Sequence, residues 1–404
     1  MAGPKGRIGS FACIHLVISI TPANLVDLVA GTLPQLAPLV KTQAGPWGKK
    51  RAYNQPAMPL RDIRELTYEE LSVLLRSWGE PPYRARQVWE WLWRHLVSDF
   101  SRMTNLPRAL RARLAEEFTA REPTPGALQL DAEEGTEKVL LHLADGEAIE
   151  AVLMREDDRR TVCVSTQVGC PVGCAFCATG KMGYVRDLTA AEIASQVLHF
   201  ARRLREAEER VTHVVIMGMG EPLLNYEATL RAVRNLNDPR GFALGARRFT
   251  ISTVGVVPGI YRLAEEGLQV NLAVSLHAPH DKLREELVPL ARRWPIREVL
   301  AAADAYVAAT GRRVTYEYVL LSGVNDGLTE ARRLARLLRG RLAHVNLIPF
   351  NPAPGLPFKR PPEARVEAFK KELLRHGVDV TVRRSRGVKI QAGCGQLRAR
   401  HTRT

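Results

Sequence analysis

The chain has 404 residues, 46% of them hydrophobic and 25% charged, which is the composition of a globular protein with a large buried core. Its net charge of +15 favours a polyanionic partner such as nucleic acid, although a basic surface can also serve solubility alone. The six cysteines are too sparse for a disulfide-stabilised secreted scaffold. No apolar run approaches the ~20 residues of a membrane-spanning helix, so we expect a cytoplasmic protein of two or three domains without membrane contact.

Residues 1–57 differ in composition from the rest of the chain. They contain six lysines and arginines, one acidic residue and scattered glycine and proline, without helical or strand periodicity. Such a segment cannot bury enough apolar surface to offset the entropy of ordering. We interpret it as a disordered extension that the folded protein can lack, with Met58 as an alternative start.

Residues 58–123 predict a small helical domain. The run Thr67–Glu70 has the spacing of a capping box at the start of a first helix. A second helix is expected over Ala85–Val97, where Trp89 and Trp93 fall on one face. This stripe indicates core packing rather than a platform for stacked bases.

Residues 124–160 alternate short polar and apolar segments around Glu134-Gly135 and Asp145-Gly146, which predicts a β-hairpin segment. Residues 161–383 then alternate strand-like apolar runs with amphipathic helical patterns. This alternation predicts an α/β fold whose parallel sheet closes into a partial (β/α)6 barrel of the TIM type. Functional residues of such a barrel lie at the carboxyl ends of its strands. The predicted strands are Thr161–Ser165, His213–Met217, Phe249–Ser252, Val270–Ser275, Val314–Leu321 and His344–Pro349.

Three cysteines form the run Cys170-Pro-Val-Gly-Cys174-Ala-Phe-Cys177 after the first predicted barrel strand. A four-iron cluster usually takes four cysteine thiolates, so three close ligands leave one iron with an open position for a substrate. The alternative is a zinc site, which would need Cys163 or a distant histidine as its fourth ligand. The spacing favours an iron–sulfur cluster that takes part in chemistry.

Further polar groups follow the later strands of the barrel. In Gly218-Met219-Gly220-Glu221-Pro222, Gly220 permits close backbone approach and Glu221 can accept a hydrogen bond from an ammonium group. Hydroxyl, imidazole and amide groups would join them at one mouth of the barrel and suit a polar cofactor. These candidates are Ser252, Ser275, Leu276, His277 and Asn351.

Two solitary cysteines accompany this constellation. Cys163 precedes the cluster run by seven residues, and Cys394 lies between glycines in a basic C-terminal segment, 384–404. A solitary cysteine is often a small buried hydrophobic residue. At Cys394, however, the glycines argue against burial, and nearby cations would favour the thiolate. These cations are Arg386, Lys389 and Arg398.

The cysteine run and the Gly-Glu-Pro element resemble those of the radical S-adenosylmethionine (SAM) enzymes. With Cys163, Ser275-Leu276-His277, Asn351-Pro352 and Ala392–Leu397 added, residues 59–398 are similar to the RlmN/Cfr family of RNA methyltransferases. The resemblance implies one [4Fe-4S] cluster on the three cysteines of the run. It also implies that SAM binds the open iron, with its amino group at Glu221.

The resemblance further implies a use of two SAM molecules in each turnover. The first would methylate Cys394, and the second would give a 5′-deoxyadenosyl radical that removes hydrogen from that methyl group. The resulting carbon radical would add to C2 of an adenosine, with Glu150 or Cys163 as acceptor of the C2 proton. Cys163 would then release the product and leave a transient disulfide with Cys394.

Partners follow from the same resemblance. The implied substrates are adenosines in the peptidyl-transferase centre of 23S rRNA and in tRNA, and 58–123 would serve as an RNA-binding accessory domain. The implied electron donor is a flavodoxin- or ferredoxin-type protein, and a monomer is expected. Two departures from the family pattern concern the local loop: Val388-Lys389 stands where an acidic residue is usual, and Gly393 replaces a common alanine.

Other functions remain open at this point. A Cfr-like enzyme would methylate C8 of adenine with the same motifs. A non-catalytic iron–sulfur protein would need neither Glu221 nor Asn351 nor the two solitary cysteines, and a zinc-stabilised RNA-binding module would need a fourth zinc ligand.

Overall fold

The computed structural model describes residues 60–383 and 386–397. Contacts divide the chain into two units, Met1–Met58 and Pro59–Thr404, and all described residues belong to the second. The extension predicted over 1–57 and the cation Arg398 lie outside the described residues. Within those residues, no helix is long and apolar enough to cross a membrane.

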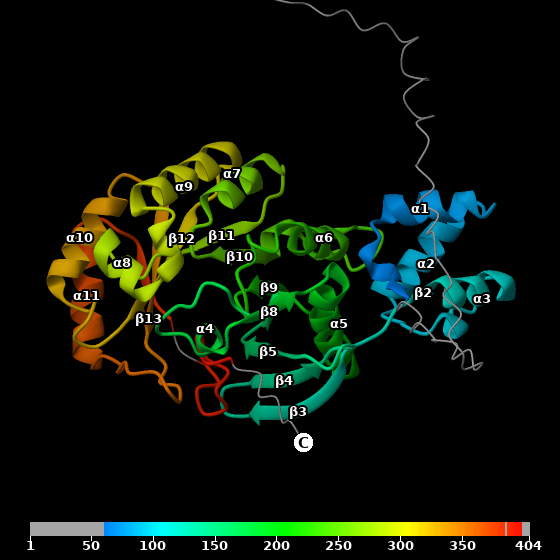
Figure 1. Cartoon of the computed structure of the whole chain (residues 1–404), viewed down its shortest axis with the longest axis horizontal. Helices are drawn as coiled ribbons and strands as arrows, with labels where there is room; N and C mark the ends of the chain where they lie inside the picture. The colour runs from blue at the N-terminus through cyan, green and yellow to red at the C-terminus, as the bar shows by residue number, and fades with distance from the viewer. Residues whose placement is uncertain (1–59, 384–385, 398–404) are drawn as a thin grey trace, which may run out of the picture. The chain divides into compact units, whose positions relative to one another are not determined.

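The second unit begins with a helical region, labelled α1 to α3 in Figure 1. The capping box is present: the Thr67 hydroxyl accepts from Glu70 N at 3.2 Å, and the Glu70 carboxylate accepts from Thr67 N at 2.8 Å. The second helix ends earlier than predicted, and Leu96 beyond it has a φ of 60°, which no α-helix continues. The elements are the 3-10 helices Ile63–Glu65 and Phe100–Arg102, α1 (Tyr68–Ser77), α2 (Tyr83–Trp93), α3 (Arg108–Glu117), β1 (Arg61–Asp62) and β2 (Phe118–Thr119).

The tryptophan stripe of α2 forms the core of this region, which confirms the packing prediction. Trp89 and Trp93 are buried, and Trp89 meets Tyr68 edge to face with ring centroids 5.7 Å apart. Large rings of this kind dominate the energetics of a small core. Trp91 points elsewhere, and its Nε1 donates to Asn105 Oδ1 at 2.5 Å.

A ten-stranded sheet in the order β14-β13-β12-β11-β10-β9-β6-β5-β4-β3 organises the rest of the unit. Strands β6 and β9 to β14 pair in parallel and form the partial barrel, and every predicted barrel strand is present. The edge strand β14 (Val380–Val382) was not predicted, because three residues are too few to show a pattern. The other parallel strands are β6 (Arg159–Cys163), β9 (His213–Ile216), β10 (Phe249–Thr253), β11 (Asn271–Ser275), β12 (Val314–Leu320) and β13 (Ala343–Pro349).

The segment 124–160 has the predicted hairpin turns at Glu134-Gly135 and Asp145-Gly146, but its place in the main sheet was not predicted. It forms three antiparallel strands that continue the main sheet beyond β6, and β5 pairs with β6 through Val152 and Cys163. The alternating pattern predicted strands but could not indicate their partner. Because a free β6 edge would leave backbone groups unpaired, β5 satisfies them and joins this segment to the barrel. The strands are β3 (Thr124–Asp131), β4 (Thr136–His142) and β5 (Ala148–Glu156).

Helices cover the outside of the parallel strands (Figure 1). The α5 capping box is present as predicted, since Thr189 and Glu192 exchange side-chain to backbone hydrogen bonds. The helices are α4 (Ala178–Met182), α5 (Ala190–Glu206), α6 (Tyr226–Asn237), α7 (Val257–Glu265), α8 (Asp281–Leu287), α9 (Ile296–Thr310), α10 (Leu328–Leu338) and α11 (Glu363–Arg375), with 3-10 helices Ala246–Arg248 and Pro289–Arg292. A small pair of strands, β7 (Gln167–Gly169) and β8 (Tyr184–Asp187), flanks α4.

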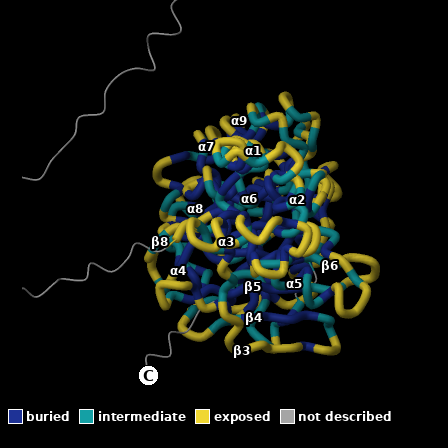
Figure 2. The backbone as a smooth tube through the Cα atoms, turned by 90° about the vertical axis from the view of Figure 1, so that its right-hand side faces the viewer, coloured by how far each residue is buried: buried dark blue, intermediate teal, exposed yellow. Residues whose placement is uncertain are grey.

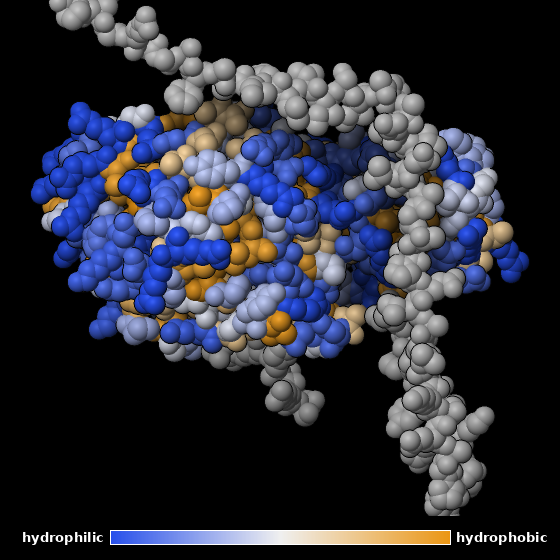
Figure 3. Space-filling model, turned by 45° about the horizontal axis from the view of Figure 1, so that its top comes forward, coloured by the Kyte–Doolittle hydropathy of each residue, from blue (hydrophilic) through white to orange (hydrophobic). Residues whose placement is uncertain are grey.

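Burial follows this layering. The central strands of the sheet are mostly buried, whereas β3 at its far edge is almost wholly exposed (Figure 2). Hydrophilic side chains cover most of the face drawn in Figure 3, around a smaller hydrophobic area. The inside of the barrel and its carboxyl-end mouth are therefore the enclosed places where a site can form.

Candidate active site

The cysteine run lies in the long connection between β6 and α5, directly after β7 and directly before α4. Backbone contacts fix this loop: Cys170 N donates to Gly183 O at 2.8 Å, and Cys177 N donates to Cys174 O at 3.2 Å. All three cysteines line one cavity at the mouth of the barrel. The loop thus brings the three thiols to one place at the carboxyl end of the first parallel strand.

Burial makes this cavity unfavourable for bare thiolates. It raises the pKa of Cys170 to about 12 and the pKa of Cys174 well above its usual value, and neighbouring thiols raise both further. Burial also raises the pKa of Cys177. A metal centre reverses this preference, because a coordinating thiol is deprotonated by the metal charge. The donor set therefore fits an iron–sulfur cluster.

The arrangement does not suit a single ion. Within residues 60–383 and 386–397, no group of three or more His, Cys, Asp or Glu side chains could hold one metal ion. Zinc needs its ligands at one point, about 2.0–2.3 Å from the ion. A four-iron cluster instead spreads its cysteine ligands around a larger body, so the zinc alternative has no support in the described residues.

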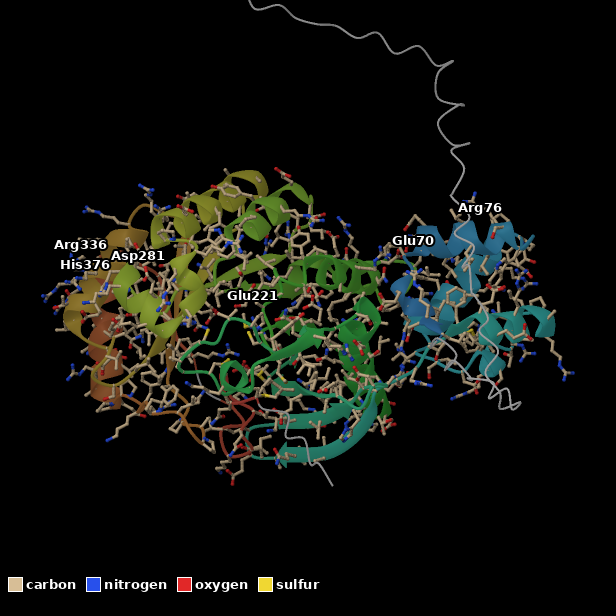
Figure 4. The ribbon with its side chains drawn as sticks, viewed as in Figure 1. Glu70, Arg76, Glu221, Asp281, Arg336 and His376 are labelled. Carbon is tan, nitrogen blue, oxygen red and sulfur yellow. The ribbon has the colours of Figure 1, made fainter. Side chains whose placement is uncertain are left out.

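Glu221 stands on the same cavity, after β9, and Figure 4 shows it inside the α/β region. Its carboxylate accepts from Val254 N at 2.8 Å and from Leu223 N at 3.1 Å, yet burial raises its pKa to about 7. Gly220 beside it has a φ of 104°, and a Cβ there would lie 2.7 Å from Thr166 Oγ1. Only glycine therefore fits this approach.

Most of the other cofactor candidates line this cavity too. Ser252 and Ser275 meet there, with their hydroxyl oxygens 3.4 Å apart. His277 Nδ1 accepts from Val319 N at 3.1 Å, and burial lowers the pKa of His277 to about 3, so the ring is neutral. Asn351 lines the cavity and donates to Cys394 O at 3.3 Å.

Leu276 departs from the prediction. Its side chain is fully buried in the main hydrophobic core and does not line the cavity. Strand β11 ends at Ser275, which faces the cavity, and Leu276 after it points into the core; a φ of 59° at His277 turns the chain so that this ring lines the cavity. The backbone carbonyl oxygen of Leu276 accepts a hydrogen bond from Arg284 Nε at 3.2 Å.

Cys394 is half-buried and lines two cavities, the one described above and a second inside the barrel. The cation that shares both cavities with it is Arg383, whose charge interacts with the Cys394 sulfur. The predicted cations are engaged elsewhere: Arg386 pairs with Glu156 at 2.7 Å, and Lys389 pairs with Glu133 at 2.5 Å. Sequence reasoning missed Arg383 because it missed β14, whose carboxyl end carries it.

Cys163 lines the second cavity together with Cys394 and Arg383. Cys163 is buried, and burial is the main cause that raises its pKa to about 12. The nearby Cys394 raises this pKa further, whereas the positive charge of Arg383 lowers it. Both solitary cysteines are free thiols in this structure. The fold thus brings together two cysteines that lie far apart in the sequence. The positive charge of Arg383 acts on both of them.

Glu150, the third catalytic candidate, lines neither of these two cavities. It lies on β5 and lines a third cavity with Lys138 and Gln391, separate from the lining of the other two. Its carboxylate is 3.1 Å from Lys138 Nζ. On β5, Glu150 is two residues before Val152, which pairs with Cys163, so Glu150 and Cys163 are diagonal neighbours on one face of the sheet.

Comparison with known proteins identifies the family and the fold. Residues 164–335 match the family model of the Radical SAM superfamily, and residues 61–119 match that of the ribosomal RNA large subunit methyltransferase N-terminal domain. A Symbiobacterium thermophilum protein named probable dual-specificity RNA methyltransferase RlmN is 52% identical over 84% of this chain and 91% of its own. The chain belongs to the RlmN family of radical SAM methyltransferases.

Other relatives of the RlmN family agree. A Chloroflexus aurantiacus protein of the same name is 49% identical over 86% of this chain and 95% of its own. The crystal structure of a radical SAM methyltransferase from Sphaerobacter thermophilus is 54% identical, with a TM-score of 0.82 over 85% of this chain and 100% of that one. Membership makes the protein a SAM-dependent RNA methyltransferase that uses a [4Fe-4S] cluster and SAM.

Proposed function

We propose that this protein methylates C2 of adenosine in 23S rRNA and in tRNA, with Cys394 as carrier of the methyl group. The names of relatives 45% and 52% identical, dual-specificity RNA methyltransferases, support two RNA substrates. The observation that carries the proposal is the position of Cys394 on both the cavity of the cysteine run and the cavity of Cys163. One thiol can thus serve a methyl donor on one side and an RNA base on the other.

The first cavity is where the cofactors would bind. The three cysteines of the run would hold the cluster, and Glu221 would accept from the amino group of SAM beside Gly220. When bound, the cluster and SAM supply one-electron chemistry that gives a carbon radical. Such chemistry is needed because adenine C2 is electrophilic and its hydrogen is not acidic. The remaining polar groups of the lining are Ser252, Ser275, His277 and Asn351.

Cys394 acts first as a nucleophile that takes a methyl group from SAM. A thiolate is the reactive form, and a cation close to the sulfur favours it. Arg383 lines both cavities with Cys394 and supplies that charge. The residue thereby prepares Cys394 for methyl transfer without taking part in bond exchange itself.

Cys163 acts last, by attack on the Cys394 sulfur to free the methylated base. As a neutral thiol it must first lose its proton. Burial is the main cause of the raised pKa of Cys163 and persists, but methylation of Cys394 removes the second cause, while the opposing effect of Arg383 remains. The first step therefore favours ionisation of Cys163 for the last step.

The net charge of +15 suits an RNA substrate, because contacts of lysine and arginine with phosphates supply affinity that falls with salt. The helical region α1 to α3 would add RNA contacts as an accessory domain. We further propose a monomer in the cytoplasm that receives electrons from a flavodoxin- or ferredoxin-type protein.

Replacement of Arg383 by glutamine is expected to slow methylation of Cys394 by about 10- to 100-fold, the effect of removing the charged partner of a buried thiolate. Mass spectrometry of the Cys394 peptide after mixing with SAM measures this rate. Arg386→Gln is the matched control, and it should change the rate less than about fivefold because its ion pair is partly exposed. Equal effects of both substitutions would contradict the role of Arg383.

Binding of SAM is expected to strengthen as pH rises through 7. The ammonium group of SAM prefers the Glu221 carboxylate, whose pKa is raised to about 7 by burial, so affinity should fall about tenfold per pH unit below that value. Equilibrium binding to cluster-loaded protein between pH 5.5 and 8.5 measures this. Glu221→Gln should bind SAM weakly at every pH, and a wild-type affinity that does not change with pH would exclude Glu221 as the partner.

The proposed function is tested by mass spectrometry of nucleosides from a strain that lacks the gene. We expect 2-methyladenosine to disappear from both 23S rRNA and tRNA, and to return with the wild-type gene but not with Cys394→Ala. Loss of 8-methyladenosine instead would assign the Cfr-like activity.

A further inference from the structure

Lys138 links the predicted proton acceptor to the loop that carries Cys394. Its Nζ lies 3.1 Å from Glu150 Oε1 and 3.3 Å from the carbonyl oxygen of Gln391. The two charged side chains are only 8% and 9% exposed. A buried ammonium group is tolerated when a counter-charge and further acceptors surround it, and Lys138 has both.

The strand register explains this pairing. On the adjacent strands β4 and β5, Leu140 is opposite Glu150 and Lys138 is opposite Val152. Residues two apart on a strand share a face, so Lys138 and Glu150 are diagonal neighbours on the same side of the sheet. The loop 386–397 covers that side, which brings Gln391 onto Lys138.

The loop is fixed on both sides of Cys394. After it, Gln396 Nε2 donates to Pro352 O at 2.7 Å, and Asn351 donates to Cys394 O at 3.3 Å. Before it, Gln391 has a φ of 53°, a conformation that non-glycine residues seldom adopt without support. The contact with Lys138 is the buried, charged support of this turn.

We propose that Lys138 is a positioning residue for Cys394, which acts by holding the carbonyl of Gln391 three residues before the thiol. Its ion pair with Glu150 keeps the ammonium group in place. The inference rests on the proposed role of Cys394 as methyl carrier. It also gives Glu150 a place beside the loop that carries Cys394.

The same loop offers a matched control. Lys389 pairs with Glu133 at 2.5 Å, but the two side chains are 70% and 78% exposed. Exposed pairs contribute little, because water screens them and the side chains lose entropy on pairing. Removal of Lys389 changes the charge of the loop as much as removal of Lys138 does, without removing a buried contact.

Hydrogen–deuterium exchange of the cluster-loaded protein tests the proposal. The amides of Ile390, Gln391 and Ala392 donate within the loop, so their exchange reports its opening. Lys138→Met should accelerate their exchange about tenfold or more, as expected for loss of a hydrogen bond from a charged group. Lys389→Gln should leave it within about twofold. Wild-type exchange of the loop in Lys138→Met would overturn the proposal.

A second variant guards against general destabilisation. In the double variant Lys138→Met, Glu150→Leu, apolar side chains replace the buried pair, which proteins often tolerate well. Its loop should still exchange fast while β4 and β5 remain protected. Equal acceleration in β4 and β5 would assign Lys138 a merely structural role.

A chemical readout separates this inference from the proposed function. Methylation of Cys394 by SAM, followed by mass spectrometry, should be about tenfold slower in Lys138→Met and largely restored in Lys138→Arg, which keeps the charge and donors. A normal rate in Lys138→Met would overturn the positioning role. Failure of the wild-type protein to methylate Cys394 would instead contradict the proposed function, and the exchange data would still judge the loop contact.

Discussion

A Cys163→Ala enzyme is expected to remain covalently attached to its RNA through Cys394. Without Cys163, the methylene group can still join the Cys394 sulfur to adenine C2, but no thiol is left to attack that sulfur and release the base. Cys163 lines the same cavity as Cys394. The remaining described cysteine of that lining is Cys177, which is expected to be bound to the cluster and therefore cannot replace Cys163. A denaturing gel should show a protein–RNA band that nuclease removes, with turnover reduced to a single event.

The control for this trapping experiment is the double variant Cys163→Ala, Cys394→Ala. It lacks the carrier of the methyl group and should form no band. A crosslink that survives loss of Cys394, or a Cys163→Ala enzyme that turns over normally, would show that the two cysteines do not have these roles.

Replacement of Cys170, Cys174 or Cys177 by alanine should abolish the brown iron–sulfur absorption and the cleavage of SAM. Each thiol lines the same cavity, and each is buried enough that its thiolate requires the metal charge. Loss of one ligand of three leaves a second iron open, so the cluster should not survive purification. Visible absorbance at neutral pH and analysis of iron and sulfide measure the loss of the cluster. Release of 5′-deoxyadenosine measures the cleavage of SAM.

Cys163→Ala and Cys394→Ala serve as controls for cluster binding. Both cysteines line the second cavity, inside the barrel, so each of these variants should keep its full content of iron and sulfide. Loss of the cluster from Cys163→Ala would show that Cys163 is a metal ligand. It would then support a site with four cysteine ligands, as in the zinc alternative.

Local patterns in the sequence predicted much of the fold. The six apolar runs became β6 and β9 to β13, and the two capping boxes begin α1 and α5. These features depend on residues close together in the chain, so the sequence displays them directly. The pairing of 124–160 with the rest of the sheet is not local, and the sequence did not indicate that its hairpin strands join the barrel sheet through β6.

The candidate site shows the same division. The strand-end rule indicated Glu221, Ser252, Ser275, His277 and Asn351, and the structure has all five on one cavity. It failed for Arg383, because the strand before it has only three residues.

Side-chain partners were harder still to predict from the sequence. The cations Arg386 and Lys389 are near Cys394 in sequence but pair with Glu156 and Glu133 of the β-strand segment. A Cβ at Gly393 would lie 2.8 Å from Gln396 Oε1 and 2.9 Å from Asn351 Nδ2, so an alanine there would require these two side chains to shift.

The central claim, transfer of a methyl group to adenine C2 through Cys394, is tested most directly with RNA whose adenosines carry deuterium at C2 or at C8. Purified cluster-loaded protein, SAM and a reductant should give 2-methyladenosine that has lost the C2 deuterium and kept the C8 deuterium. The methyl group should derive from a Cys394 that was methylated beforehand with labelled SAM. Loss of the C8 deuterium, or product whose methyl group never passes through Cys394, would contradict the account.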